Sequence, residues 1–113
     1  MKRAVPLLDH RAEFSLRESI DDEYGGTRDE WLLQFVEWVG VKYLRGTEAV
    51  MQARLASRNP MVITVRTSAR ARQITSEWRV TLRSRSGVTF VAEVREDPRP
   101  SEGDGFLEML CEG

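Results

Sequence analysis

The chain has 113 residues, of which 41% are hydrophobic and 31% are charged, and its formal net charge is −1 at pH 7. This size suits one domain with one core that needs neither disulfides nor metals, so we expect a domain over residues 1–113 with residues 1–10 as a flexible arm. Its apolar runs are too short for a membrane span or a signal peptide, and the lone Cys111 is typical of a reducing compartment, which favours a cytoplasmic protein with no membrane contact.

The charges are unevenly distributed along the chain. Two of the 17 basic residues are lysines, so fifteen are arginines, which suit interfaces and phosphate recognition. Residues 58–85 contain seven arginines and one acid, a local net charge of +6, whereas residues 86–113 contain two arginines and seven acids, a net charge of −5. This division favours a protein that docks a basic face onto an acidic face of a second copy, head to tail around a ring.

The first half of the chain predicts two strands. Residues 11–19 place Ala12, Phe14 and Leu16 in alternation with polar residues, and residues 19–30 read as a polar loop that turns at Gly25-Gly26. Residues 31–44 are apolar with some helical spacing, but Gly40, valines and aromatics favour a strand over 33–43. That strand is apolar on both faces, which is typical of a central strand or of one that faces a partner molecule.

The segment 46–57 predicts a short helix. Thr47 can serve as its N-cap, Glu48 lies in the first turn, and Asn59-Pro60 ends it. Because about ten helical residues are marginal alone, this helix needs a surface to lie on.

The second half of the chain predicts strands over residues 61–66, 78–83, 88–94 and 106–111, with polar loops over 67–76 and 97–105 and a hairpin turn over 84–87. Trp78, Val80 and Leu82 alternate with arginines, and Leu107, Met109 and Cys111 share one face. The fold class is therefore mainly β, a small β-barrel or sandwich of about six strands with one short α-helix in an excursion.

The sequence contains little that supports a catalytic or cofactor-binding site. The one histidine, His10, lies beside Asp9 near the terminus, where a solvated or capping residue is expected, and Cys111 reads as a buried small hydrophobe. The acids at 21–23, 29 and 30 do not match a calcium loop, and no phosphate-binding or nucleophile motif occurs. We expect no enzyme, no cofactor and no metal site.

Four arginines, Arg70, Arg72, Arg79 and Arg83, offer two interpretations. They can form a nucleic-acid groove, or they can lie on an outer sheet face and meet acids such as Glu93 or a neighbouring subunit. The second interpretation is favoured because nucleic-acid grooves often add exposed aromatics, whereas Trp78 and Phe90 are predicted to point inward.

The order of these elements resembles the head–tail joining family of tailed phages, prophages and gene transfer particles, the head-closure or stopper proteins. The resemblance covers the chain from about Leu8 and rests on Gly25-Gly26, Trp31, Val36-Glu37-Trp38-Val39-Gly40-Val41, Arg45-Gly46-Thr47-Glu48, Ile63-Thr64-Val65-Arg66, the strand from Trp78 to Leu82, and Phe106-Leu107-Glu108-Met109-Leu110-Cys111. One departure is the strand over 88–94, where family members often carry an aromatic or tyrosine-plus-isoleucine pattern and this chain has Phe90 and Val94.

The resemblance implies a virion structural protein that forms a homo-oligomeric ring at the neck of the particle and is assembled in the bacterial cytoplasm. Six or twelve copies would contact portal–adaptor proteins on the head side and the tail terminator or tail tube protein on the tail side, with double-stranded DNA passing through the channel. By the same analogy, the loops 19–30 and 44–60 are candidates for channel lining or neighbour contact. The candidate subunit-interface or channel-facing residues are Trp31, Trp38, Arg45, Glu48, Arg54, Arg70, Arg72, Arg79 and Arg83. The alternatives are a small nucleic-acid-binding β-barrel and, with the Asp9-His10 pair as its sole basis, a small hydrolase.

Overall fold

The structure, a computed structural model, describes residues 7–44, 59–101 and 105–113. Its elements in chain order are β1 (His10–Asp21), β2 (Thr27–Tyr43), β3 (Pro60–Arg66), a short 3-10 helix η1 (Ala71–Gln73), β4 (Trp78–Arg83), β5 (Thr89–Val94), β6 (Arg99–Pro100) and β7 (Phe106–Glu112). The mainly β fold predicted from the alternating apolar residues is therefore confirmed. The predicted helix over 46–57 lies outside the described residues.

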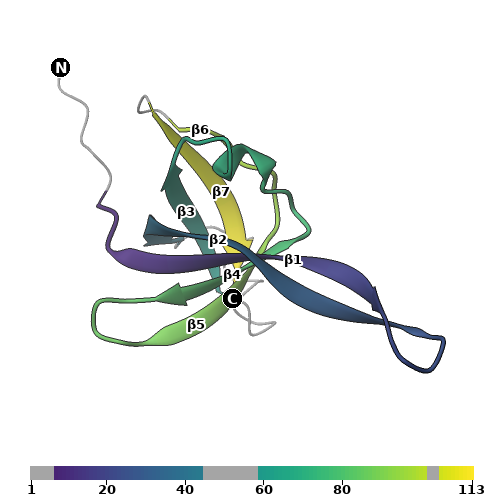
Figure 1. Cartoon of the computed structure of the whole chain (residues 1–113). Helices are drawn as coiled ribbons and strands as arrows, with labels where there is room; N and C mark the ends of the chain where they lie inside the picture. The colour runs from purple at the N-terminus through teal and green to yellow at the C-terminus, as the bar shows by residue number, and fades with distance from the viewer. Residues whose placement is uncertain (1–6, 45–58, 102–104) are drawn as a thin grey trace, which may run out of the picture.

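The strands form one antiparallel sheet that closes on itself (Figure 1). The strand order is β3-β2-β1-β4-β5-β7-β6, and β3 also pairs with β7, so six strands complete a barrel. The short β6 pairs with the first half of β7, beside the two-residue contact between β5 and the end of β7. This closure agrees with the predicted barrel of about six strands, and it leaves few of these strands with an unpaired edge.

The core lies inside the barrel and is built from the alternating apolar residues of the strands. Phe14, Val80, Leu82, Ile63 and Met109 are almost completely buried. The rings of Phe14 and Phe35 stack with centroids 4.7 Å apart, and Trp78 packs against Phe35 at 6.2 Å. The inward face predicted for each of these strands is therefore the face that packs the core.

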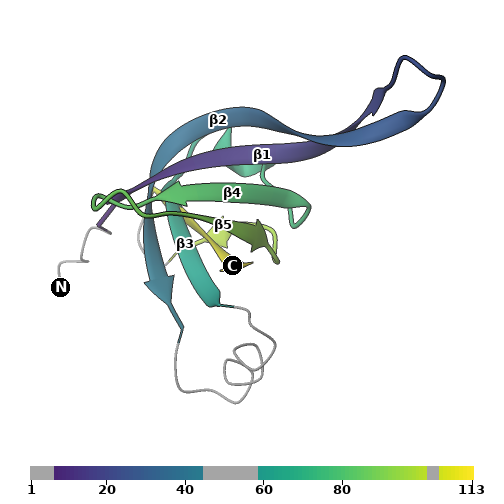
Figure 2. The same ribbon diagram turned by 90° about the horizontal axis from the view of Figure 1, so that it is seen from below.

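The strands β1 and β2 continue well beyond the barrel as a two-stranded arm (Figure 2). Ladder pairing runs from His10↔Val39 to Asp21↔Thr27, with an irregularity between Phe14 and Ser15 where β2 contributes an extra residue. The predicted polar loop over 19–30 is therefore wrong, because most of it belongs to the two strands of this arm. The backbone N–H and C=O groups of the two strands pair across the hairpin. Polar side chains do not prevent this pairing, because they point away from both faces of an exposed ribbon.

The connection between β3 and β4 is more ordered than the polar loop predicted over 67–76. Its centre forms η1, whose Ala71 is completely buried, and Ile74 beyond it is also buried. The side-chain oxygen of Ser68 accepts a hydrogen bond from the Ala71 amide at 3.0 Å. Two apolar residues among polar neighbours thus attach this connection to the core.

A close backbone approach explains a glycine in the middle of β2. Gly40 is buried, and a Cβ at this position would lie 2.7 Å from the carbonyl oxygen of Leu7. The segment before β1 therefore crosses β2 at a point where no side chain fits.

Candidate interaction surface

The outer face of the barrel over β2, β1, β4 and β5 gathers both aromatic and charged side chains. We define the outer face by the residues that point away from the core in these strands: Arg11, Glu13, Ser15, Arg17, Trp31, Leu33, Val36, Trp38, Arg79, Thr81, Arg83, Thr89, Val91 and Glu93. Three of its apolar side chains are well exposed, Leu33 at 55%, Trp38 at 44% and Val91 at 47%. Such a mixture of exposed apolar groups and arginines is typical of a contact surface.

One end of the outer face is organised around Arg79. Its guanidinium carbon lies 4.0 Å from the ring centroid of Trp31, and its Nη2 donates a hydrogen bond to Glu93 Oε1 at 2.8 Å. The Nε of Arg79 is buried without a hydrogen-bond partner among the described residues. A polar hollow of about 450 Å³ borders this group, lined also by Arg17, Asp29 and Glu77. The predicted cross-strand contact between an arginine of β4 and Glu93 is confirmed.

The other end of the outer face brings two arginines together without an acid between them. Arg11 of β1 and Arg83 of β4 are directly opposite in the ladder, an arrangement in which like charges repel. The Arg11 guanidinium lies over the exposed Trp38 ring at 5.2 Å. These arginines, with Glu13, Val36, Thr81 and Thr89, line a hollow of about 300 Å³. In the described part of the chain neither arginine forms an ion pair, so both remain available to a partner.

The turn of the arm is organised by one carboxylate. Asp22 Oδ1 accepts hydrogen bonds from the backbone amides of Tyr24 at 2.8 Å and Gly26 at 2.9 Å. Gly25 adopts a φ of +81°, a conformation that side-chain-bearing residues rarely adopt. The phenol ring of Tyr24 is thereby presented at the tip with 94% of its surface exposed.

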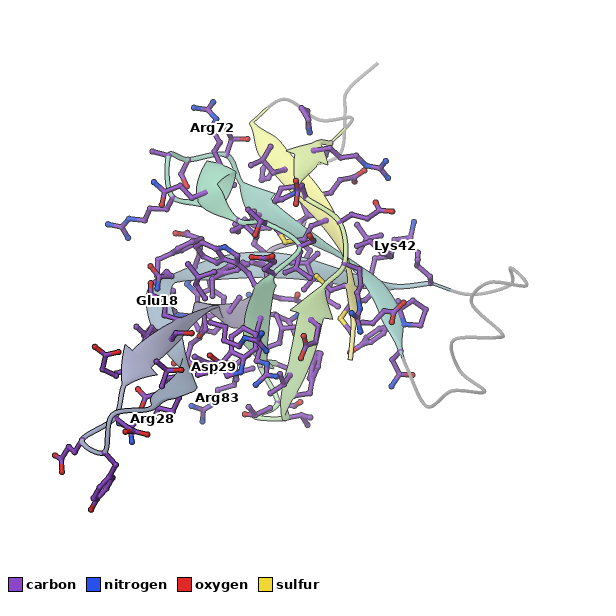
Figure 3. All side chains as sticks on the ribbon, turned by 90° about the vertical axis from the view of Figure 1, so that its right-hand side faces the viewer. Glu18, Arg28, Asp29, Lys42, Arg72 and Arg83 are labelled. Carbon is purple, nitrogen blue, oxygen red and sulfur yellow. The ribbon has the colours of Figure 1, made fainter. Side chains whose placement is uncertain are left out.

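The structure brings together four of the nine residues predicted as interface or channel residues. Trp31, Trp38, Arg79 and Arg83 all lie on the outer face. Arg70 and Arg72 lie on the exposed β3–β4 connection; Figure 3 shows Arg72 at the top of the barrel, away from Arg28 and Asp29 on the arm. The remaining three, Arg45, Glu48 and Arg54, lie outside the described residues.

Sequence reasoning missed several members of the outer face, above all Arg11, Leu33 and Val91. The outward position of Arg11 could have been found from its alternation with Ala12. Its position opposite Arg83 depends on the pairing of β1 with β4, which no sequence pattern specifies. The irregularity after Phe14 also places Leu33 on the same face as Arg17 and Trp31.

The expected complementarity of the basic and acidic segments is partly satisfied within the barrel. The basic β4 pairs with the acidic β5, and β3 pairs with β7. The bond between Arg79 and Glu93 joins the two segments directly. The segments therefore do not form two separate faces, and charges on the outer face, on the arm and at Arg70 and Arg72 of the β3–β4 connection are exposed to a neighbour.

His10 and Cys111 have different surroundings. His10 begins β1, and its side chain is only 16% exposed, so of the two expectations for it, a solvated or a capping residue, the solvated one is wrong. Its ring lies edge-on to Phe90 at 6.4 Å and is 2.8 Å from Asp9 Oδ1, and this hydrogen bond lowers the pKa of Asp9. Cys111 is completely buried as predicted, and this burial raises the pKa of its thiol to about 12.

The described ranges contain no group of three or more histidine, cysteine, aspartate or glutamate residues that could hold a metal ion. In the part of the chain that the structure describes, no helix has the length and apolar character needed to cross a membrane.

The fold and the outer face define a small closed β-barrel that carries a long two-stranded arm. The phage head completion protein family matches residues 4–113, and the chain belongs to this family. It is a family of structural phage proteins and not a class of enzymes.

Two solved structures share the fold. The solution structure of protein SF1141 from Shigella flexneri 2a has a TM-score of 0.68 and 22% sequence identity, with 92% of this chain and 90% of that chain covered. A chain of the virion of the native gene transfer agent particle has a TM-score of 0.60 and 20% identity, with 96% of each chain covered. The comparison with curated proteins found no match.

Proposed function

We propose that this chain is a head-closure, or stopper, protein that forms a ring of copies between the portal–adaptor proteins and the tail. DNA would pass through the centre of this ring when it leaves the head. The family supports a structural role in completing the head. The similarity to a chain of a gene transfer agent virion supports a place in a phage or phage-like particle. The role needs no catalytic group, and assembly would take place in the bacterial cytoplasm before the tail joins.

The observation that carries the proposal is the composition of the outer face. Exposed Leu33, Trp38 and Val91 lie beside arginines that no acid neutralises within the described chain. Tryptophan and arginine are the residues that contribute most to binding energy at protein interfaces. We therefore assign subunit contacts to Trp38 and Arg83 in a ring of six or twelve copies, while Trp31 and Arg79, which contact each other, remain candidates on the same face. The exposed Arg70 and Arg72, with Arg45, Glu48 and Arg54, remain candidates for contacts with the channel or with head and tail proteins.

The decisive experiment removes the protein from the particle. In its absence, electron microscopy should show filled or leaking heads without tails, because nothing closes the head or receives the tail. Restoring the gene should restore tailed particles, whose necks can then be averaged to count copies in the ring. Normal tailed particles in the absence of the protein would contradict the proposal.

A second candidate function is nucleic-acid binding by the barrel itself. The observation in its favour is Trp38, an exposed aromatic beside Arg11 and Arg83, because exposed aromatics and arginines together bind single strands. Against it, Arg79 and Arg17 are already engaged by Glu93 and Asp29. The test is DNA binding at low salt. Binding should weaken steeply as salt rises, and the absence of binding at about 50 mM salt would exclude this function.

A further inference from the structure

The arm formed by residues 17–31 contacts its own barrel at its base, where the Trp31 ring lies against Arg79, and its two strands pair with no other strand in the described ranges. Pairing of β1 with β4 ends at Leu16, so the five pairs from Arg17↔Trp31 to Asp21↔Thr27 belong to a two-stranded ladder only. Five pairs extend about 17 Å at the usual rise of an antiparallel strand. An isolated two-stranded ribbon is marginally stable in water. The arm is therefore a segment that gains stability when a second molecule covers it.

The tip of the arm is acidic, and hydrogen bonds to Asp22 define its turn. Residues 17–31 contain six acids and two arginines, a net charge of −4. Both arginines are engaged within the arm, Arg17 with Asp29 at 3.6 Å and Arg28 with Glu30 at 2.9 Å. The carboxylate of Asp22 accepts the turn hydrogen bonds. This leaves Glu18, Asp21 and Glu23 without an ion pair in the described ranges, and Asp21 and Glu23 lie close in sequence to the exposed Tyr24.

The hollow beside Arg11 and Arg83 has the complementary composition. Two facing guanidinium groups repel one another until a carboxylate lies between them. Glu13 lines the same hollow, so Arg11, Arg83 and Glu13 together carry a net charge of +1. Val36 and Trp38 supply apolar surface next to the charges. An aromatic ring flanked by acids therefore fits this hollow in both charge and polarity.

The arm cannot reach this hollow in its own copy, because it extends away from the barrel that carries the hollow (Figure 2). Each copy nevertheless carries both surfaces. We propose that the tip of the arm, Asp21, Glu23 and Tyr24, docks on the Arg11–Arg83 hollow of the next copy. A contact between two different surfaces of identical chains closes into a ring when the rotation is suitable. This inference rests on the proposed ring and names the contact that builds it.

The test uses charge reversal in particles that lack the native protein. One variant, Asp21→Arg with Glu23→Arg, reverses the charge of the arm. A second variant, Arg11→Glu with Arg83→Glu, reverses the charge of the hollow. Alone, each variant places like charges at every contact and should reduce the number of tailed particles by about tenfold or more. Expressed together, the variants can alternate around a ring of even copy number, so each contact regains opposite charges and tailed particles should return.

A matched control separates this contact from general charge effects. Arg70→Glu with Arg72→Glu makes the same change in net charge at the β3–β4 connection, and it should not be rescued by the arm variant. Thermal unfolding of each purified variant confirms that the barrel is folded. The inference is overturned if folded single variants yield normal tailed particles, or if the mixture fails to restore them. Loss of function by the hollow variant without loss by the arm variant also overturns it, since the hollow then binds DNA or another head protein.

A direct contact measurement complements the particle count. The chain has two lysines, Lys2 and Lys42, so Arg83→Lys introduces an amine at the hollow while keeping its charge. Zero-length carbodiimide coupling in assembled particles, made from isotopically light and heavy copies, should join this amine to Asp21 or Glu23 of another copy. The same treatment of Arg72→Lys should give no such product. If the ring is present and the arm peptides couple only elsewhere, the arm inference fails while the proposed ring stands.

Discussion

Arg79 of β4 lies over the ring of Trp31 of β2, with 4.0 Å between the guanidinium carbon and the ring centroid, although β1 separates the two strands. Trp31 lies at the base of the arm, whereas Arg79 belongs to the barrel and also forms an ion pair with Glu93 at 2.8 Å. The contact therefore holds the base of the arm against the barrel and sets the direction in which the arm extends.

Removal of this contact should loosen the arm without unfolding the barrel. In Trp31→Ala, amide hydrogen exchange in residues 17–21 and 27–30 should become roughly fivefold faster, as expected for the loss of a cation–π contact of about 1 kcal/mol. Trp38→Ala is the matched control, because Trp38 contacts Arg11 at the other end of the outer face. Equal exchange rates in both variants would show that Trp31 does not support the arm.

The turn at the tip should depend on Asp22. The substitution Asp22→Ala removes the acceptor of two backbone hydrogen bonds, each of which contributes about 1 kcal/mol. We expect the NMR amide signals of Tyr24 and Gly26 to shift towards random-coil values while those of the core strands remain. Glu23→Ala leaves both turn hydrogen bonds in place and serves as the control. An unchanged turn in Asp22→Ala would contradict the assignment.

The core should be far more sensitive to truncation than the outer face. Phe14 is completely buried and stacked on Phe35, so Phe14→Ala should lower the free energy of unfolding by about 3–5 kcal/mol. Val91 is half exposed on the outer face, and Val91→Ala should change the free energy by less than about 0.5 kcal/mol. Urea unfolding of the two variants measures the difference. Comparable losses would mean that Val91 is packed in the free chain.

Cys111 should make the fold less stable at alkaline pH. Burial raises the pKa of its thiol from 9.0 to about 12. Below pH 9 the thiol is protonated in both states, but between pH 9 and 12 it ionises only in the unfolded chain, which favours unfolding. The free energy of unfolding should therefore fall with pH in this window by up to about 1.4 kcal/mol per pH unit more than in Cys111→Ala. Parallel curves for the two proteins would contradict a buried thiol.

Several strands were predictable because alternation alone marks a half-buried strand. Trp78, Val80 and Leu82 alternate with arginines, and the structure places β4 over the same residues. The sequence of residues 19–30 predicts a loop instead of a strand pair for the opposite reason. A ribbon exposed on both faces has no apolar alternation, so its charged residues resemble a loop even though they pair regularly.

The sequence by itself determined the mainly β fold and the inward face of each core strand, because burial demands apolar residues at every second position. It also determined the excess of arginine available for contacts. Only the tertiary structure decided which side chains meet. The pairing of β1 with β4 sets Arg11 opposite Arg83, and the extra residue in β2 directs Trp31 toward Arg79. The partner of β1 on this side is β4, whose paired residues lie more than sixty positions further along the chain, and the local alternation of each strand does not specify which strands pair.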